Sequence, residues 1–344
     1  MPLRAREIYA EALNKFRLGP TAEELIQHVM AGDDRGRNLE ESLRSDAFFT
    51  RHVLVAASER LKKGEVKDLS HAVVLLGPEA TRDFVFGHTI YRSVDREADG
   101  KFEGFEKSAT WAPRTKQLGE FAAKIKYESV GSALALGLVF DFLEKKLTSQ
   151  IDLEAQFSPW IEKAWNHSLR VASIAWGFAN HERIQVKLKK MVFPAGFLHD
   201  IGRIFLASLR PKDYLALQSK LEEGRGSSPD DDTYEVAIEK ERFGLSHCEL
   251  GSWLVHHTRF LMDYEMLVDY HHDFAVLKTR NPDQFVVALL VHIADRVSFL
   301  LENKAQYEIR DLEKILDPHK NNFPLGAVDL NNLVMGLRSR GFVP

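Results

Sequence analysis

The feature of this sequence that most restricts its fold is the polar pair His199-Asp200, which directly follows the apolar run Phe193–Leu198. Such a run predicts a buried helix that delivers both side chains to the floor of a cavity. A buried carboxylate without a partner is costly, and a metal ion supplies that partner. Neighbours on a regular helix point about 100° apart, so both can face one site only if the helix ends or bends there. Gly202 follows at once, which favours such a break.

Further candidate ligands lie at distant points of the C-terminal half: His167, His247, His271, His272 and Asp295. Imidazole and carboxylate suit divalent transition-metal ions, and we favour iron or manganese while zinc and nickel stay open. Seven candidates exceed the roughly four ligands that one tetrahedral ion takes. We expect His167, His199, Asp200 and Asp295 to hold one ion, and His247, His271 and His272 to hold a second ion that shares Asp200. Two close metal ions with a water between them are suited to attack on phosphate esters.

The composition of the whole chain excludes several classes of protein. A formal net charge of -4 over 344 residues lacks the basic footprint of a DNA-binding protein. The single cysteine, Cys248, allows no intramolecular disulfide, which fits a reducing cytoplasm. The longest apolar stretch, around Ala133–Phe142, is too short to span a bilayer. We therefore expect a cytoplasmic protein with no membrane span and no DNA partner.

Helical patterns dominate the sequence, and strand signals are scarce. Ile8, Ala12 and Phe16 follow an i, i+4 stripe. Ser246 and Glu249 have the spacing of a capping box at the start of a helix. No run of alternating β-branched residues is bounded by hairpin turns. The sequence therefore predicts an all-α fold.

Three polar stretches punctuate the helical patterns. Asp95–Gly104 is charged and contains glycine, and Thr148–Pro159 is polar and ends in proline. These two bracket a helical segment at about residues 109–147. Glu222–Asp232 has the composition of a solvated loop.

The order of the candidate ligands, with Gly-Phe-Leu-His-Asp-Ile-Gly-Arg at residues 196–203, resembles the HD superfamily of metal-dependent phosphohydrolases. Two branches of that superfamily are similar to this chain. The HD-GYP cyclic di-GMP phosphodiesterases share all seven ligand positions, whereas the HDOD (HD-related output domain) proteins match more of the chain. The HDOD resemblance covers about residues 20–95 and 155–300, and includes Trp165–Ser168 and Phe243–Gly251.

The resemblance implies an HD-domain helical bundle preceded by an N-terminal helical subdomain. We expect residues 1–95 to form the N-terminal helical half and residues 96–155 to form a helical insertion. Residues 156–317 would form the metal-binding helical domain, and residues 318–344 a C-terminal tail with one helix near Leu330–Leu337.

The chain departs from the HD-GYP pattern at three places. The Gly-Tyr-Pro tripeptide is missing after His272, where the sequence continues Asp273-Phe274-Ala275. Arg203 stands where that branch has lysine; it could clamp a phosphate or serve as a structural salt-bridge partner. Lys163 stands where some members carry a glutamate for a third metal. Many HDOD proteins have lost ligands and act as signalling scaffolds, whereas this chain keeps the complete set.

Three functions follow as hypotheses. In the first, a bacterial-type signalling protein hydrolyses a phosphodiester, with cyclic di-GMP the first substrate to test; Asp200 bridges two ions and Arg203 neutralises phosphoryl charge. In the second, a catalytically silent HDOD output module binds a partner signalling protein. In the third, the chain binds a cyclic dinucleotide without cleaving it. The insertion at about residues 109–147 could form a homodimer interface or only pad the core.

Overall fold

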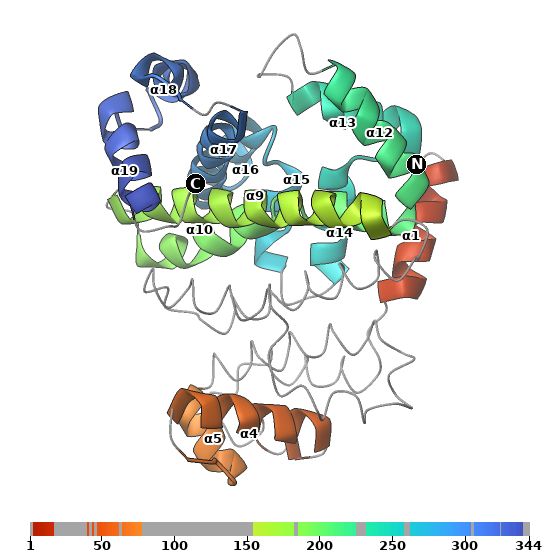
Figure 1. The fold of residues 1–344 in the computed structure, drawn as a ribbon, viewed down its shortest axis with the longest axis vertical. Coiled ribbons are helices and arrows are strands. Elements are labelled where there is room, and N and C mark those ends of the chain that lie inside the picture. Colours follow the sequence, from red (N-terminus) through yellow and green to blue (C-terminus); the bar gives the residue numbers. More distant parts are fainter. Residues whose placement is uncertain are drawn as a thin grey trace. The chain divides into compact units, whose positions relative to one another are not determined.

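The computed structural model describes residues 3–16, 40, 43–44, 47–61, 64–77, 154–181, 185–224, 232–257, 262–303, 306–323 and 325–339. Every regular element in these ranges is a helix, which confirms the predicted all-α class (Figure 1). The α-helices are α1 (Leu3–Phe16), α4 (Ala47–Leu61), α5 (Leu69–Leu76), α9 (Glu154–His181), α10 (Val186–Leu198), α11 (Ile201–Leu209), α12 (Pro211–Gly224), α13 (Asp232–Phe243), α14 (His247–His257), α15 (Glu265–Asp269), α16 (Leu277–Arg280), α17 (Pro282–Asn303), α18 (Ile309–Leu316) and α19 (Ala327–Ser339). Short 3-10 helices are η3 (Met262–Tyr264), η4 (Phe274–Val276) and η5 (Asp317–His319).

The chain forms two compact units, one made of Met1–Tyr9 with Lys146–Pro344 and the other of Ala10–Lys145. In the second unit, α4 and α5 pack against each other. Val53 and Ala57 of α4 and Ala72 of α5 belong to one buried apolar cluster there. The predicted insertion at 96–155 lies outside the described residues except for its last two, so our domain boundaries stay predictions. Of the predicted loop at 222–232, residues 225–231 also lie outside them.

Helix α9 is the long central helix of the first unit, and it packs against α10, α17 and α19 (Figure 1). Ile161, Trp165 and Ala172 are fully buried at helical spacing along its inner face. The helix begins at Glu154, so Pro159, which we expected to end a polar linker, lies inside it. A proline near the start of a helix removes only one backbone hydrogen bond, and burial of the apolar face offsets that loss.

Helices α9 and α10 approach each other closely at Gly196. A Cβ atom at this position would lie 2.9 Å from the Cα of Ala172. Only glycine permits this separation, because real Cβ atoms essentially never make such a short contact with backbone. The close approach brings the end of α10 next to the middle of α9, where His167 lies.

The predicted break at His199-Asp200 is confirmed. Helix α10 ends at Leu198, and α11 begins at Ile201 after a turn formed by the polar pair. The predicted helix near Leu330–Leu337 is confirmed as α19, and Leu330 and Val334 are fully buried in the core shared with α9 and α17. The turn that holds His199 and Asp200 lies between the two apolar helices α10 and α11, whose surrounding side chains fix its position.

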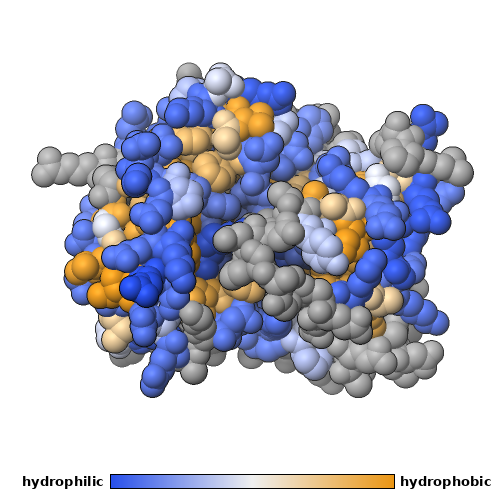
Figure 2. All heavy atoms as spheres, turned by 90° about the horizontal axis from the view of Figure 1, so that it is seen from above, coloured by the Kyte–Doolittle hydropathy of each residue, from blue (hydrophilic) through white to orange (hydrophobic). Residues whose placement is uncertain are grey.

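Two helical stretches, Lys187–Leu209 and Pro282–Asn303, are long and apolar enough to cross a membrane by length and composition. Their most apolar windows are 94% and 56% buried inside the structure, which is also the behaviour of core helices. On the face shown in Figure 2, hydrophobic residues form separate patches among hydrophilic ones. Burial accounts for the hydropathy of the first stretch, and two helices of this kind are weak evidence of a membrane span.

Candidate metal centre

Five segments of the first unit bring the seven predicted ligands together. His167 lies on α9, His199-Asp200 form the turn between α10 and α11, and His247 is the first residue of α14. His271-His272 follow α15, and Asp295 lies on α17. Every one of these side chains has a nitrogen or oxygen atom within 4 Å of an atom of another member. The convergence that the sequence predicted is therefore present.

His167, His199 and Asp295 form the first half of the centre. The Nε2 atom of His167 lies 3.1 Å from Asp295 Oδ1 and 3.7 Å from Asp200 Oδ2. The Nε2 atom of His199 lies 3.4 Å from Asp200 Oδ2 and 3.9 Å from Asp295 Oδ1. Both imidazoles thus face the same pair of carboxylate oxygens.

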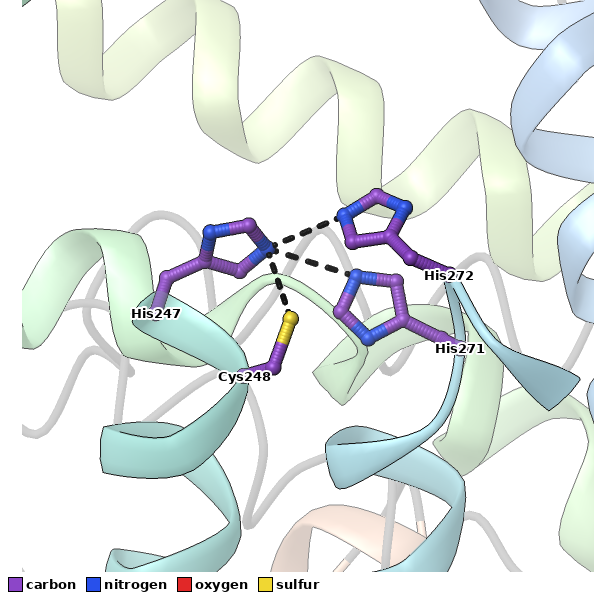
Figure 3. Close-up of side chains that lie close together, drawn as sticks. All are labelled: His247, Cys248, His271 and His272. Atoms are coloured by element: carbon purple, nitrogen blue, oxygen red, sulfur yellow. Dashed lines mark hydrogen bonds between the residues drawn. The ribbon is translucent and has the colours of Figure 1, made fainter. Parts of the chain in front are cut away.

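His247, His271 and His272 form the second half (Figure 3). The Nε2 atom of His247 lies 3.4 Å from Nε2 of His271 and 3.2 Å from Nε2 of His272. Asp200 Oδ1 lies 3.5 Å from Nε2 of His247 and 3.5 Å from Nε2 of His271. Asp200 therefore directs one oxygen toward each half, which is the arrangement that a bridging carboxylate requires.

Unsatisfied buried atoms support a fit between these residues and metal ions. Nε2 of His199 is buried and makes no hydrogen bond within the described part of the chain, and Oδ1 of Asp200 makes no aligned one although it forms an ion pair with Arg203. A buried polar atom without a partner is costly, and a cation would satisfy both atoms at once. The clustered histidine and carboxylate groups could thus bind metal.

In three of the histidines the other ring nitrogen is held by a neighbour, which aims Nε2 at the centre. Backbone carbonyls accept the Nδ1–H of two rings: that of Gly196 lies 2.7 Å from His199, and that of Val268 lies 2.7 Å from His271. Glu239 Oε2 lies 2.6 Å from Nδ1 of His247. Such partners fix the tautomer and the orientation of a metal-binding imidazole.

At Asp200 and in the first half of the centre, the electrostatics favour the protonation states that bind metal. Burial alone would raise the pKa of Asp200, but the Arg203 guanidinium and the nearby imidazoles outweigh it and hold this pKa well below its ordinary value. Burial also opposes the charge of Asp295, yet the hydrogen bond and charge of His167 lower its pKa. Burial lowers the pKa of His199 to about 4. Ionised carboxylates and a neutral imidazole are thus present at neutral pH.

Comparison with known proteins identifies the region that carries the centre. Residues 129–274 match the HDOD domain family. The chain contains an HDOD domain. The match includes all the candidate ligands except Asp295, and it begins inside the segment 96–155 that we predicted to be an insertion. Among curated proteins, none matches the chain.

Two solved structures share the fold. A predicted phosphohydrolase from Shewanella amazonensis SB2B is 16% identical, with a TM-score of 0.53 over 97% of this chain and 95% of its own. An HDOD domain protein with unknown function from Geobacter sulfurreducens is 18% identical, with a TM-score of 0.52 over 98% of this chain and 93% of its own. Similarity at this level of identity shows the fold alone, so the activity of this chain must be argued from its own residues.

Arg203 of the HDOD domain lies between two buried carboxylates. Its Nε lies 3.2 Å from Asp200 Oδ1, and its second guanidinium nitrogen lies 3.2 Å from Glu235 Oε2. Of the two roles open to this residue, these contacts support the structural salt bridge. The phosphate-binding role stays a prediction.

Sequence reasoning missed three residues of the site: Glu239, Ser298 and Cys248. The carboxylate of Glu239 also accepts a hydrogen bond from the backbone N–H of His247 at 2.8 Å. Ser298 Oγ lies 3.3 Å from Nδ1 of His167. Glu249 accepts the backbone N–H of Ser246 at 2.8 Å and completes the predicted capping box. The one available signal concerned Glu239, which lies four residues after Glu235 on α13. In the sequence, such a pair of glutamates is typical of the solvated face of a helix.

We expect Glu239→Gln to weaken metal binding by the second half of the centre about 10–100-fold, because the glutamate orients His247 and raises its basicity. Competition with a chromophoric chelator measures the affinity. Glu241→Gln is the matched control, since Glu241 lies on the same helix with an exposed side chain. Equal affinities for the two variants would contradict the orienting role.

Proposed function

We propose that this HDOD protein is a metal-dependent phosphohydrolase that cleaves a phosphodiester, with cyclic di-GMP as the first substrate to test. The observation that carries the proposal is the position of Asp200, whose two oxygens face two separate groups of imidazoles. A carboxylate shared in this way is the part that turns two neighbouring sites into one dinuclear centre. We assign His167, His199 and Asp295 to one ion and His247, His271 and His272 to the other.

Two divalent ions, when bound, lower the pKa of water toward about 7 and offset charge on phosphoryl oxygens. The chain contributes the arrangement around them. Asp200 would hold the halves at a fixed separation, and the Nδ1 partners of His199, His247 and His271 would keep their Nε2 atoms aimed inward. Arg203 would fix the carboxylate of Asp200 and, in the stronger form of the proposal, neutralise charge that develops on the phosphoryl group.

The exposure of the cluster supports access from the side of the first half. The side chains of His167 and Asp295 are 15% and 16% exposed, whereas that of His247 is 0% exposed. A substrate phosphate would therefore approach beside His167 and Asp295. We further propose that the protein works in the cytoplasm as a signalling protein, without DNA, with a partner signalling protein and a homodimeric state both open to test.

The test is reconstitution of the purified protein with manganese, iron, zinc or nickel. We expect about two ions per chain, measured by elemental analysis, together with hydrolysis of bis(p-nitrophenyl) phosphate and of cyclic di-GMP. Product analysis beside calorimetry separates the two alternatives. Calorimetric binding of cyclic di-GMP without products would indicate a sensor, and two bound ions with neither binding nor turnover would indicate a silent output module. Absence of bound metal after reconstitution would remove the proposal.

A further inference from the structure

We propose that Cys248 is a ligand of the ion in the second half, so that His247, Cys248, His271 and His272 form a zinc-selective site. The inference rests on the metal centre of the proposed function and deepens it. It distinguishes the two halves by their chemistry: one has a thiolate, and the other has only nitrogen and oxygen donors.

Three of the six distances between the donor atoms, those from Nε2 of His247, are close to the edges of a tetrahedral zinc site (Figure 3). The Sγ atom of Cys248 lies 3.4 Å from Nε2 of His247. Around a zinc ion with bonds of about 2.0–2.1 Å to nitrogen and about 2.3 Å to sulfur, tetrahedral geometry gives N···N edges of about 3.3–3.4 Å and N···S edges of about 3.5–3.6 Å. The N···N separations of 3.4 and 3.2 Å fall close to these values. All four donors also lie within 4.8 Å of one another.

The surroundings of the thiol are unusual for a buried cysteine. A free buried cysteine generally behaves as a small apolar residue, but the Cys248 side chain turns toward the imidazoles of the second half (Figure 3). Cys248 is 5% exposed, and His247 and His271 are 0% and 2% exposed. A sulfur atom enclosed with three imidazole rings is the donor set of a soft or borderline metal ion. When the sulfur–metal bond forms, the thiol proton passes to solvent.

The thiolate would make the two halves unequal. Structural zinc sites are closed by four protein ligands, whereas catalytic sites keep a position for water or substrate. In the second half the three imidazoles and the sulfur already supply four protein ligands, so this half would be closed, with Asp200 Oδ1 as an additional contact. The first half has His167, His199, Asp295 and the other oxygen of Asp200, and it is the more exposed of the two. We therefore assign the reacting position to the first half and a structural role, with a preference for zinc over manganese, to the second.

Cobalt substitution and X-ray absorption test the assignment on the full chain. The protein has one cysteine, so any thiolate-to-cobalt charge-transfer band must arise from Cys248. We expect that band in the cobalt-loaded wild type, and one sulfur at about 2.3 Å from zinc in the zinc-loaded form. Cys248→Ser should lose the band and weaken binding of one of the two zinc ions about tenfold or more, because loss of even an outer partner costs 10–100-fold. His256→Gln is the matched control on α14, since its ring pairs with Glu265 instead of the centre, and it should keep both signals.

The outcomes separate this inference from the proposed function. The wild type could bind two cobalt ions without a charge-transfer band, and two zinc ions without a sulfur neighbour in the X-ray absorption spectrum. That result would overturn the role of Cys248 but leave the dinuclear centre in place. A wild type that binds no cobalt and no zinc would overturn the centre itself. If Cys248→Ser fails to fold, as circular dichroism would reveal, the wild-type spectra decide alone.

Discussion

Asp200→Asn is expected to reduce metal content below about one ion per chain and to lower phosphodiester hydrolysis about 10³-fold. The substitution keeps the size of the side chain but removes the charge that faces both halves of the centre. An amide presents only one oxygen, so it cannot serve two ions, and its NH2 group would face imidazole nitrogens on one side. The loss should be larger than for any other single ligand, because each of the others serves one half only.

Elemental analysis and initial rates on a chromogenic phosphodiester measure the two effects of Asp200→Asn. Asp273→Asn is the matched control, because Asp273 follows the histidine pair with an exposed side chain and makes no capping hydrogen bond. Circular dichroism separates loss of metal from loss of fold, which matters since Asp200 also pairs with Arg203. Full metal content and wild-type rates in Asp200→Asn would contradict the bridging role.

The turn at His199-Asp200 could be predicted from sequence because it belongs to a short local pattern, whereas the other candidate ligands were chosen by their order along the chain. The apolar run before His199-Asp200 signals burial, and Gly202 signals a break. These are properties of neighbouring residues, and the structure has the turn where they place it. The all-α class followed from the same kind of local periodicity.

The contacts around the ligands could not be predicted, because they depend on how distant helices pack. Glu239 reaches His247 only because α13 lies beside the start of α14. From the sequence, Cys248 indicated only a reducing compartment. Its position next to the predicted ligand His247 did not show where its side chain points. Neighbouring side chains point about 100° apart on a regular helix, yet here both reach the same site from the first two residues of α14. Arg203 shows the same limit, since its second carboxylate partner comes from α13.

Gly202→Ala is expected to destabilise the first unit by about 3 kcal/mol, which corresponds to a fall of roughly 6–12 °C in the thermal midpoint. A Cβ atom at this position would lie 1.9 Å from the carbonyl oxygen of His247 and 2.9 Å from the backbone nitrogen of Gly251. Both are backbone atoms, so no side-chain rotation relieves the overlap, and α11 must move away from α14. Without this clash, replacing a helical glycine by alanine would stabilise the helix by about 0.5–1 kcal/mol.

The same movement would displace His247 from the other donors, so Gly202→Ala links the packing of two helices to the metal centre. Scanning calorimetry with and without zinc measures both consequences: a lower midpoint in the metal-free protein and a smaller rise in midpoint when zinc is added. Gly326→Ala is the control, because the nearest atom to a Cβ there is a side-chain oxygen of Asp329 at 3.7 Å. A Gly202→Ala variant that melts with the wild type and gains equal stability from zinc would show that α11 and α14 can separate without cost, and the position of His247 would then need another explanation than close helix packing.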